Sequence, residues 1–178
     1  MDDYNFGRNA AGIQKLEQLR SECRNSTEIY AVTVFTALCY DNMNAFEEAI
    51  RHYDAAVRIR DDGTLHSNAG LCWQRLGKPE EAEICYRKAI ASDSENPNPW
   101  NNLSALYFKQ GQYDQALEYA EAALAVDARM PQALSCAAVC TALLGRNEEY
   151  ENYYRRAVAA GYDGKKIKNV IQALNPEI

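Results

Sequence analysis

The chain has few residues that interrupt regular structure: only 9 glycines and 5 prolines occur among its 178 residues. This scarcity argues against long disordered or low-complexity stretches. Long hydrophobic runs are also missing, since no apolar stretch approaches the roughly 18 residues of a transmembrane helix. The N-terminus shows no basic start followed by an apolar run, which would mark a secretory signal. We therefore expect a cytoplasmic protein with no membrane partner.

Positive charge is in short supply as well. Lys and Arg number 19 against 25 Asp and Glu, which gives a formal net charge of -6 at pH 7. The basic residues form no long run that would mark a nucleic-acid patch. Because an acidic chain does not attract a phosphate backbone non-specifically, the composition predicts no nucleic-acid partner.

The side chains that carry catalysis and metal binding form no constellation in the sequence. Cys136 and Cys140 are four residues apart and can share a helix face, but two ligands do not make a zinc site. The two histidines, His52 and His66, lie far from them along the chain. No glycine-rich phosphate loop occurs. We therefore predict a protein that is not an enzyme and has no cofactor and no metal, with its cysteines as reduced, mostly buried thiols.

What the sequence does contain is an internal period of 34 residues. Two sets of landmarks keep this interval: the glycines Gly77, Gly111 and Gly145, and the alanines Ala89, Ala123 and Ala157. A further copy lies upstream and has Asn44 where the others have glycine. Glycine and asparagine both tolerate the left-handed conformation that ends many helices. We place four repeats at 30–62, 63–96, 97–130 and 131–164.

Each repeat has the pattern of two amphipathic helices around a turn. In 97–130 we expect them from Pro99 to about Gln110 and from about Asp114 to Val126. Small residues recur at matching places and predict close helix contacts: Ala37, Gly70, Ser104 and Ala138 in the first helices, and Ala56, Ala89, Ala123 and Ala157 in the second. One such pair cannot bury its apolar face alone, so neighbouring pairs must stack.

Both ends of the stack need a cover. The C-terminal segment 165–178 has apolar residues at helical spacing, which predict a capping helix: Ile167, Val170, Ile171 and Leu174. Residues 1–29 are expected to hold a tail and a second capping helix over about 8–24.

The clearest copy is carried by six positions: Trp100, Leu103, Ser104, Tyr107, Ala116 and Ala120. Their spacing resembles the tetratricopeptide repeat, a family of helix-turn-helix repeats. The family usually has glycine at the place of Ser104 and an aromatic residue at the place of Ala120, and the preceding copy supplies both as Gly70 and Tyr86. The resemblance implies an all-α fold, a right-handed α-solenoid, and the function of an adaptor or scaffold that binds another protein.

In that family the first helices of successive repeats line a concave groove that holds a peptide or helix. Carried over by register, the resemblance gives these partner-binding residues: Ser67, Asn68, Leu71, Gln74, Arg75, Asn98, Asn101, Asn102, Ala105, Phe108 and Lys109. The amides can hold the backbone of an extended peptide. Arg75 and Lys109 can receive an acidic group, and Phe108 can anchor an apolar side chain. The basic clamp by which some family members bind acidic chaperone tails is not preserved.

The fourth repeat departs from this polar pattern. Val139, Ala142 and Leu143 are apolar where the middle repeats are mostly polar. Either the C-terminal helix covers them, which we favour, or they form a self-association patch. The alternative function is therefore a structural protein that assembles into a homo-oligomer without a groove ligand.

Overall fold

The computed structural model describes residues 2–176, with side chains from residue 11 onward. Every regular element in these residues is an α-helix, and there are ten. The chain divides into two compact units, unit 1 (Met1–Asp93) and unit 2 (Ser94–Ile178). No helix among the described residues is both long and apolar enough to cross a membrane.

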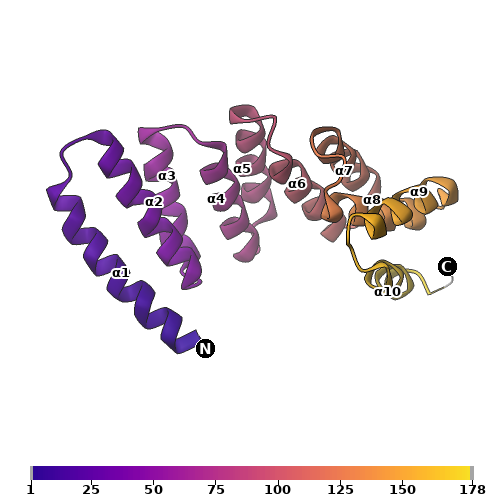
Figure 1. Ribbon diagram of the computed structural model, residues 1–178, viewed down its shortest axis with the longest axis horizontal. Helices are drawn as coiled ribbons and strands as arrows, with labels where there is room; N and C mark the ends of the chain where they lie inside the picture. The colour runs from indigo at the N-terminus through magenta and orange to yellow at the C-terminus, as the bar shows by residue number, and fades with distance from the viewer. Residues whose placement is uncertain (1, 177–178) are drawn as a thin grey trace. The chain divides into compact units, whose positions relative to one another are not determined.

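Unit 1 is a row of antiparallel helices in which each packs on the next (Figure 1). The helices are α1 (Asp2–Glu22), α2 (Ser26–Asn42), α3 (Phe46–Ile59), α4 (Gly63–Arg75) and α5 (Pro79–Ser92). The first of them begins at Asp2, earlier than the expected residue 8. Because α1 packs against α2 and buries Ile13, it covers that end of the unit.

Unit 2 continues the same pattern of paired helices. It comprises α6 (Pro97–Lys109), α7 (Tyr113–Val126), α8 (Pro131–Leu143), α9 (Asn147–Ala159) and α10 (Gly164–Leu174). Pro97 and Pro131 are the first residues of α6 and α8, where the fixed φ of proline suits a helix start. Besides the sequential pairs, α6 packs on α8, and α10 packs on both α8 and α9.

The turns within the helix pairs confirm the prediction made from glycine and asparagine. Asn44 has a φ of 57°, and Gly77, Gly111 and Gly145 have φ values of 72°, 74° and 73°. In each turn the following N–H returns to a carbonyl in the last turn of the helix, as Lys78 does to Trp73 at 3.0 Å. A Cβ at any of the three glycines would meet nothing within 4 Å. Backbone conformation alone therefore selects the residue there.

The small residues predicted to bring the helices together are fully enclosed. Seven of them have no solvent-exposed surface: Ala37, Ala56, Ala89, Ser104, Ala123, Ala138 and Ala157. Gly70 lies in a close contact of this kind, since a Cβ there would lie 2.6 Å from Cε1 of the fully buried Tyr86. The next copy has Ser104 in place of Gly70 and Ala120 in place of Tyr86. The larger Ser104 is therefore accompanied by a smaller residue on the facing helix. The Ser104 hydroxyl donates to the Ala116 carbonyl at 2.7 Å.

A polar cluster lies inside unit 1 where α2, α3 and α4 meet. The Tyr53 hydroxyl donates to Asp41 Oδ2 at 3.3 Å and is hydrogen-bonded to the side chain of Asn68. Burial raises the pKa of Tyr53 above its ordinary value, and the Asp41 carboxylate adds to the rise. The neighbouring thiol of Cys72 has its pKa raised to about 12, again by burial first and by Asp41 second. Both groups therefore stay protonated at neutral pH.

The C-terminal helix covers the apolar face of the fourth repeat, as we favoured. Val139 and Ala142 of α8 are buried, and Leu143 is half-buried. Facing α8, the α10 helix buries Ile167 and Ile171. The Asp163 carboxylate starts this helix by accepting the N–H of Lys165 at 2.9 Å.

We predict that Gly70→Ala destabilises the protein by about 1–3 kcal/mol, because the new methyl group forces the buried Tyr86 ring to shift. The matched control is Gly12→Ala in α1, where the nearest atom, Cys39 Sγ, lies at an ordinary 3.6 Å. The control should be neutral or stabilising, since alanine favours the helix. Urea unfolding followed by circular dichroism measures both. An unfolding midpoint for Gly70→Ala at or above the wild-type value would contradict the close contact.

We also predict that stability falls as pH rises from about 9 towards 12. In the unfolded chain the Cys72 thiol loses its proton near the ordinary value of 9.0, whereas the folded protein keeps it up to about pH 12. The unfolded state therefore binds fewer protons in this window, and the free energy of unfolding decreases with pH. Cys72→Ala should lose less stability than wild type between these pH values. The control is Cys23→Ala, at a partly exposed position just after α1, and this variant should follow wild type.

Candidate functional site

A cavity of about 400 Å³ opens in unit 2 between α6, α8 and α10. Twelve residues line it: Asn101, Ala105, Phe108 and Lys109 from α6, Gln132, Ser135, Cys136 and Val139 from α8, Tyr162 before α10, and Lys166, Ile167 and Val170 from α10. Successive turns of α6 present Asn101, Ala105 and Phe108 on one face because they are three and four residues apart. The cavity therefore joins the first helices of two repeats to the C-terminal helix.

The cavity has an apolar interior and a basic rim. Phe108 and Ala105 are half-buried and face Val139 and Ile167 across it. Lys109 and Lys166 are both exposed, and neither ammonium group has a hydrogen bond or ion pair within the described residues. None of the residues that line the cavity is acidic. An incoming carboxylate would thus meet two cations without displacing an existing partner.

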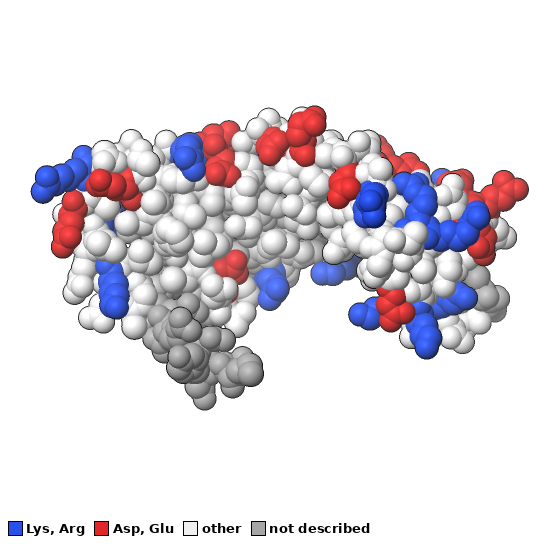
Figure 2. Space-filling view, in the orientation of Figure 1, with Lys and Arg blue, Asp and Glu red and all other residues white. Residues whose placement is uncertain are grey.

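The surface around α10 extends this positive field. Figure 2 shows several Lys and Arg side chains around α10 on the face in view, with an acidic side chain among them. The helix carries Lys165, Lys166 and Lys168, all exposed. Lys168 is already engaged, because its Nζ lies 5.3 Å from the centre of the Tyr154 ring. Lys166 is the one of the three that borders the cavity.

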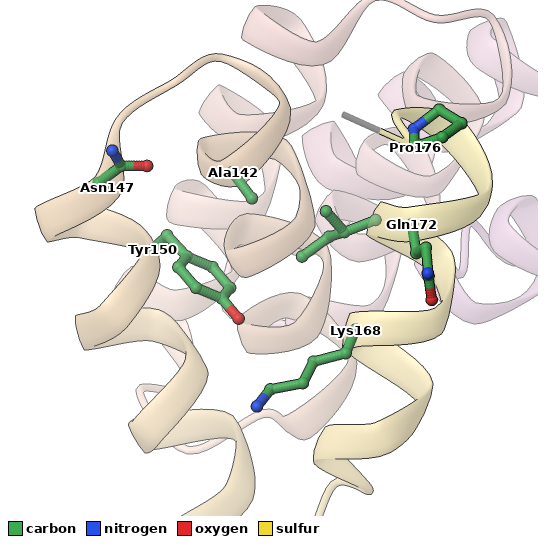
Figure 3. Close-up of a pocket in the computed structure, with 7 residues that line it drawn as sticks. Ala142, Asn147, Tyr150, Lys168, Gln172 and Pro176 are labelled. Carbon is green, nitrogen blue, oxygen red and sulfur yellow. The ribbon is translucent and has the colours of Figure 1, made fainter. Parts of the chain in front are cut away.

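A second cavity, of about 470 Å³, lies on the other side of α10. In Figure 3, Tyr150 of α9 and Lys168 of α10 point into the same space between their helices. Its remaining lining residues are Ala142, Asn147, Ile171, Gln172 and Pro176. It contains none of the predicted partner-binding residues, so the α6–α8–α10 cavity is the better candidate site.

Some of the predicted partner-binding residues of α6 line the cavity, and others do not. Asn101, Ala105, Phe108 and Lys109 come together in the cavity, which fits the register carried over from the family. Asn98 is exposed and Asn102 is half-buried, but neither lines the cavity.

The predicted residues of α4 lie in unit 1. Leu71 and Arg75 are exposed, and the Arg75 guanidinium lies 5.8 Å from the centre of the Phe46 ring. Gln74 is half-buried and accepts a hydrogen bond from Tyr86 at 3.4 Å. Ser67 is only 6% exposed, so a ligand on this face would reach Leu71 and Arg75 before it. The Asn68 side chain is occupied by Tyr53 in the polar cluster.

The sequence did not connect several residues of the cavity with the site. Lys166, Ile167 and Val170 appear in the sequence as a basic cluster and a capping stripe, and Tyr162 as part of no motif. Their role depends on how α10 docks, which no local pattern specifies. Gln132, Ser135 and Val139, in contrast, belong to the first-helix face that the family register gives for the fourth repeat, because they stand 34 residues after Asn98, Asn101 and Ala105.

One cysteine of α8, Cys136, lines the same cavity, and Cys140 lies one helical turn further along the chain. Cys136 Sγ and Cys140 Sγ are 4.0 Å apart, and Ser104 Oγ lies 3.1 Å from Cys136 Sγ. Cys140 is fully buried. Among the described residues no third His, Cys, Asp or Glu joins them in a group that could hold a metal ion. Cys136 forms part of one wall of the cavity, and Cys140 contributes to packing.

Known proteins resemble both the fold and parts of the sequence. The solved structure of MamA superposes with a TM-score of 0.77 and covers 91% of this chain and 92% of its own, at 16% identity, which is a likeness of fold. Tetratricopeptide repeat-containing protein trd-1 of Caenorhabditis elegans is 33% identical over 81 residues, or 44% of this chain. The Hsp70-Hsp90 organizing protein of Triticum aestivum is 30% identical over 83 residues, or 46% of this chain. The matches span only 10% and 14% of these two relatives.

Two family models described as the tetratricopeptide repeat match the chain, one over residues 61–129 and the other over residues 102–164. Together they extend over more than half of its length and include α4 to α9. With the helical pairs, the positive-φ turns and the enclosed small residues already described, these matches show that the chain belongs to the tetratricopeptide repeat family.

Proposed function

We propose that the chain is a protein-interaction scaffold, without catalytic activity, that holds a peptide segment of a partner protein on the first helices of its repeats. The observation that carries this proposal is the α6–α8–α10 cavity, which is apolar inside, open to solvent and lined by four residues assigned from the family register. Concave, mostly apolar sites with a few polar groups are the usual form of a binding site. The repeat boundaries 30–62, 63–96, 97–130 and 131–164 are part of the same proposal.

The groups around the cavity suit a peptide backbone. Asn101 and Gln132 supply amide donors and acceptors from neighbouring first helices, and such groups bind a main chain without selecting its side chains. Phe108 offers an aromatic surface for an apolar anchor. In unit 1 the exposed Leu71 and Arg75 offer a second, separate contact on α4.

A second candidate function is self-assembly, and one observation favours it. Phe35 of α2 is 59% exposed and Leu71 of α4 is 40% exposed, although large apolar side chains are usually enclosed. A second copy of the chain that covered these side chains would form a homo-oligomer. Sedimentation velocity over a range of concentrations separates the two functions, because a peptide-binding monomer keeps its sedimentation coefficient and a self-assembling chain does not.

We predict that filling the cavity abolishes peptide binding. A random peptide library displayed on phage is selected on the full chain and then tested on the Ala105→Trp variant, in which an indole occupies the cavity. Selected peptides should bind this variant about tenfold more weakly or worse, the loss of about 1.4 kcal/mol or more. The control is Ala125→Trp, which places the same side chain on the exposed face of α7 and should bind as wild type does.

Circular dichroism and thermal unfolding check that both variants are folded. If the selection enriches no peptide, or if every enriched peptide binds Ala105→Trp as well as wild type, the cavity is not the peptide site. A concentration-dependent oligomer with no enriched peptide would support the self-assembly function instead.

A further inference from the structure

We infer that the occupant of the α6–α8–α10 cavity is an acidic peptide segment in which an apolar side chain is flanked by carboxylates, and that α10 is one wall of the receptor as well as a cap. This inference rests on the proposed function and names the chemistry of its partner. It assigns the basic residue Lys166, which the family register does not include, to the binding surface.

The apolar residues of the site indicate where the apolar side chain of the peptide, its anchor, would bind. Ala105 and Phe108 of α6, Val139 of α8, and Ile167 and Val170 of α10 line one continuous space. Phe108 is half-buried and Val170 is 38% exposed, so both keep apolar surface that an incoming side chain can cover. Covering this surface favours binding in proportion to the area removed from water.

The charged residues of the site indicate which groups lie beside the apolar side chain of the peptide. Lys109 ends α6 and Lys166 lies in the first turn of α10, so two separate helices bring a cation to the same rim. Neither ammonium is neutralised within the described residues, and the lining contains no carboxylate that would repel an acidic ligand. Two cations beside one apolar space match an anchor with an acidic neighbour on each side.

The negative charge of the rest of the chain strengthens the preference of this site for an acidic ligand. The net charge of -6 repels acidic ligands from most of the surface, so a local positive field at α10 steers them to one place. A lysine ammonium binds a carboxylate as a point charge and does not require the planar geometry of arginine. Asn101 and Gln132 remain available for the peptide backbone between the flanking acids.

The test uses the full chain and a short fluorescent peptide, acetylated and amidated, with a central leucine between aspartate and glutamate residues. Fluorescence anisotropy measures its affinity for wild type and for the double variant Lys109→Glu with Lys166→Glu. We expect the double variant to bind about tenfold more weakly or worse, because reversing both rim charges replaces attraction with repulsion. Replacing the leucine by serine, or the acids by lysine, should cause losses of similar size.

The control variant has the same net charge but leaves the rim intact. Lys15→Glu with Lys88→Glu changes exposed lysines of α1 and α5, neither of which lines the cavity. It should keep the wild-type affinity within about twofold, since both substitutions leave the rim and the positive field at α10 unchanged. Raising the salt concentration should weaken the wild-type complex, a measurement that needs no variant to fold.

Equal binding to the two double variants, binding to wild type that is indifferent to salt, or equal binding of the lysine peptide would each overturn the inference. The selected phage peptides separate this outcome from failure of the proposed function. Peptides that are lost on Ala105→Trp but carry no acids leave the scaffold function standing and remove the acidic partner. No selected peptide at all removes both.

Discussion

The close contact between the two helices of each pair is the constraint on which the rest of the structure depends. Alanine, serine or glycine occupies the matching places in every repeat and is enclosed there, and Gly70 shows how little room remains. Aromatic rings pack against this contact inside the pair, as Tyr86 of α5 does on Gly70 of α4. One pair still leaves an apolar face in water, so neighbouring pairs stack within each unit.

Features that depend on short segments of sequence were predictable. The turn positions Gly77, Gly111 and Gly145 follow from a local backbone requirement, and Asn44 satisfies the same requirement with a different residue. The enclosed alanines follow from their period. Proline stereochemistry favours the helix starts at Pro97 and Pro131, although α6 begins two residues before the expected Pro99. In each case the energy that selects the residue comes from its immediate neighbours in the chain.

Features that depend on docking were not predictable in the same way. The sequence shows that 165–178 is amphipathic, but not that Lys166 and Val170 meet Phe108 across a cavity. Burial of Ser67 and the hydrogen bond between Asn68 and Tyr53 likewise arise from how α2, α3 and α4 meet. Arg75 and Lys109 were paired by period alone, and the structure places them in different units. Register identifies the face of a helix, whereas tertiary packing decides which residues on it stay accessible.

The same helix, α10, performs two tasks because it has two sides. Ile167 and Ile171 face α8 and are buried, while Lys166 and Val170 border the open cavity. The stripe that stabilises the end of the stack therefore also holds the rim in place. A substitution that loosens the cap would move the rim, so stability and recognition are linked at this helix.

The turn glycines have a consequence for chirality. Gly77, Gly111 and Gly145 adopt a backbone conformation that is unfavourable for an L-residue and natural for its mirror image. A D-alanine adopts this backbone conformation without strain, and it would restrict the unfolded chain more than glycine does. Each period thus contains one position with a mirror-image backbone, which glycine adopts because it is achiral and which the L-residue Asn44 adopts in the first repeat.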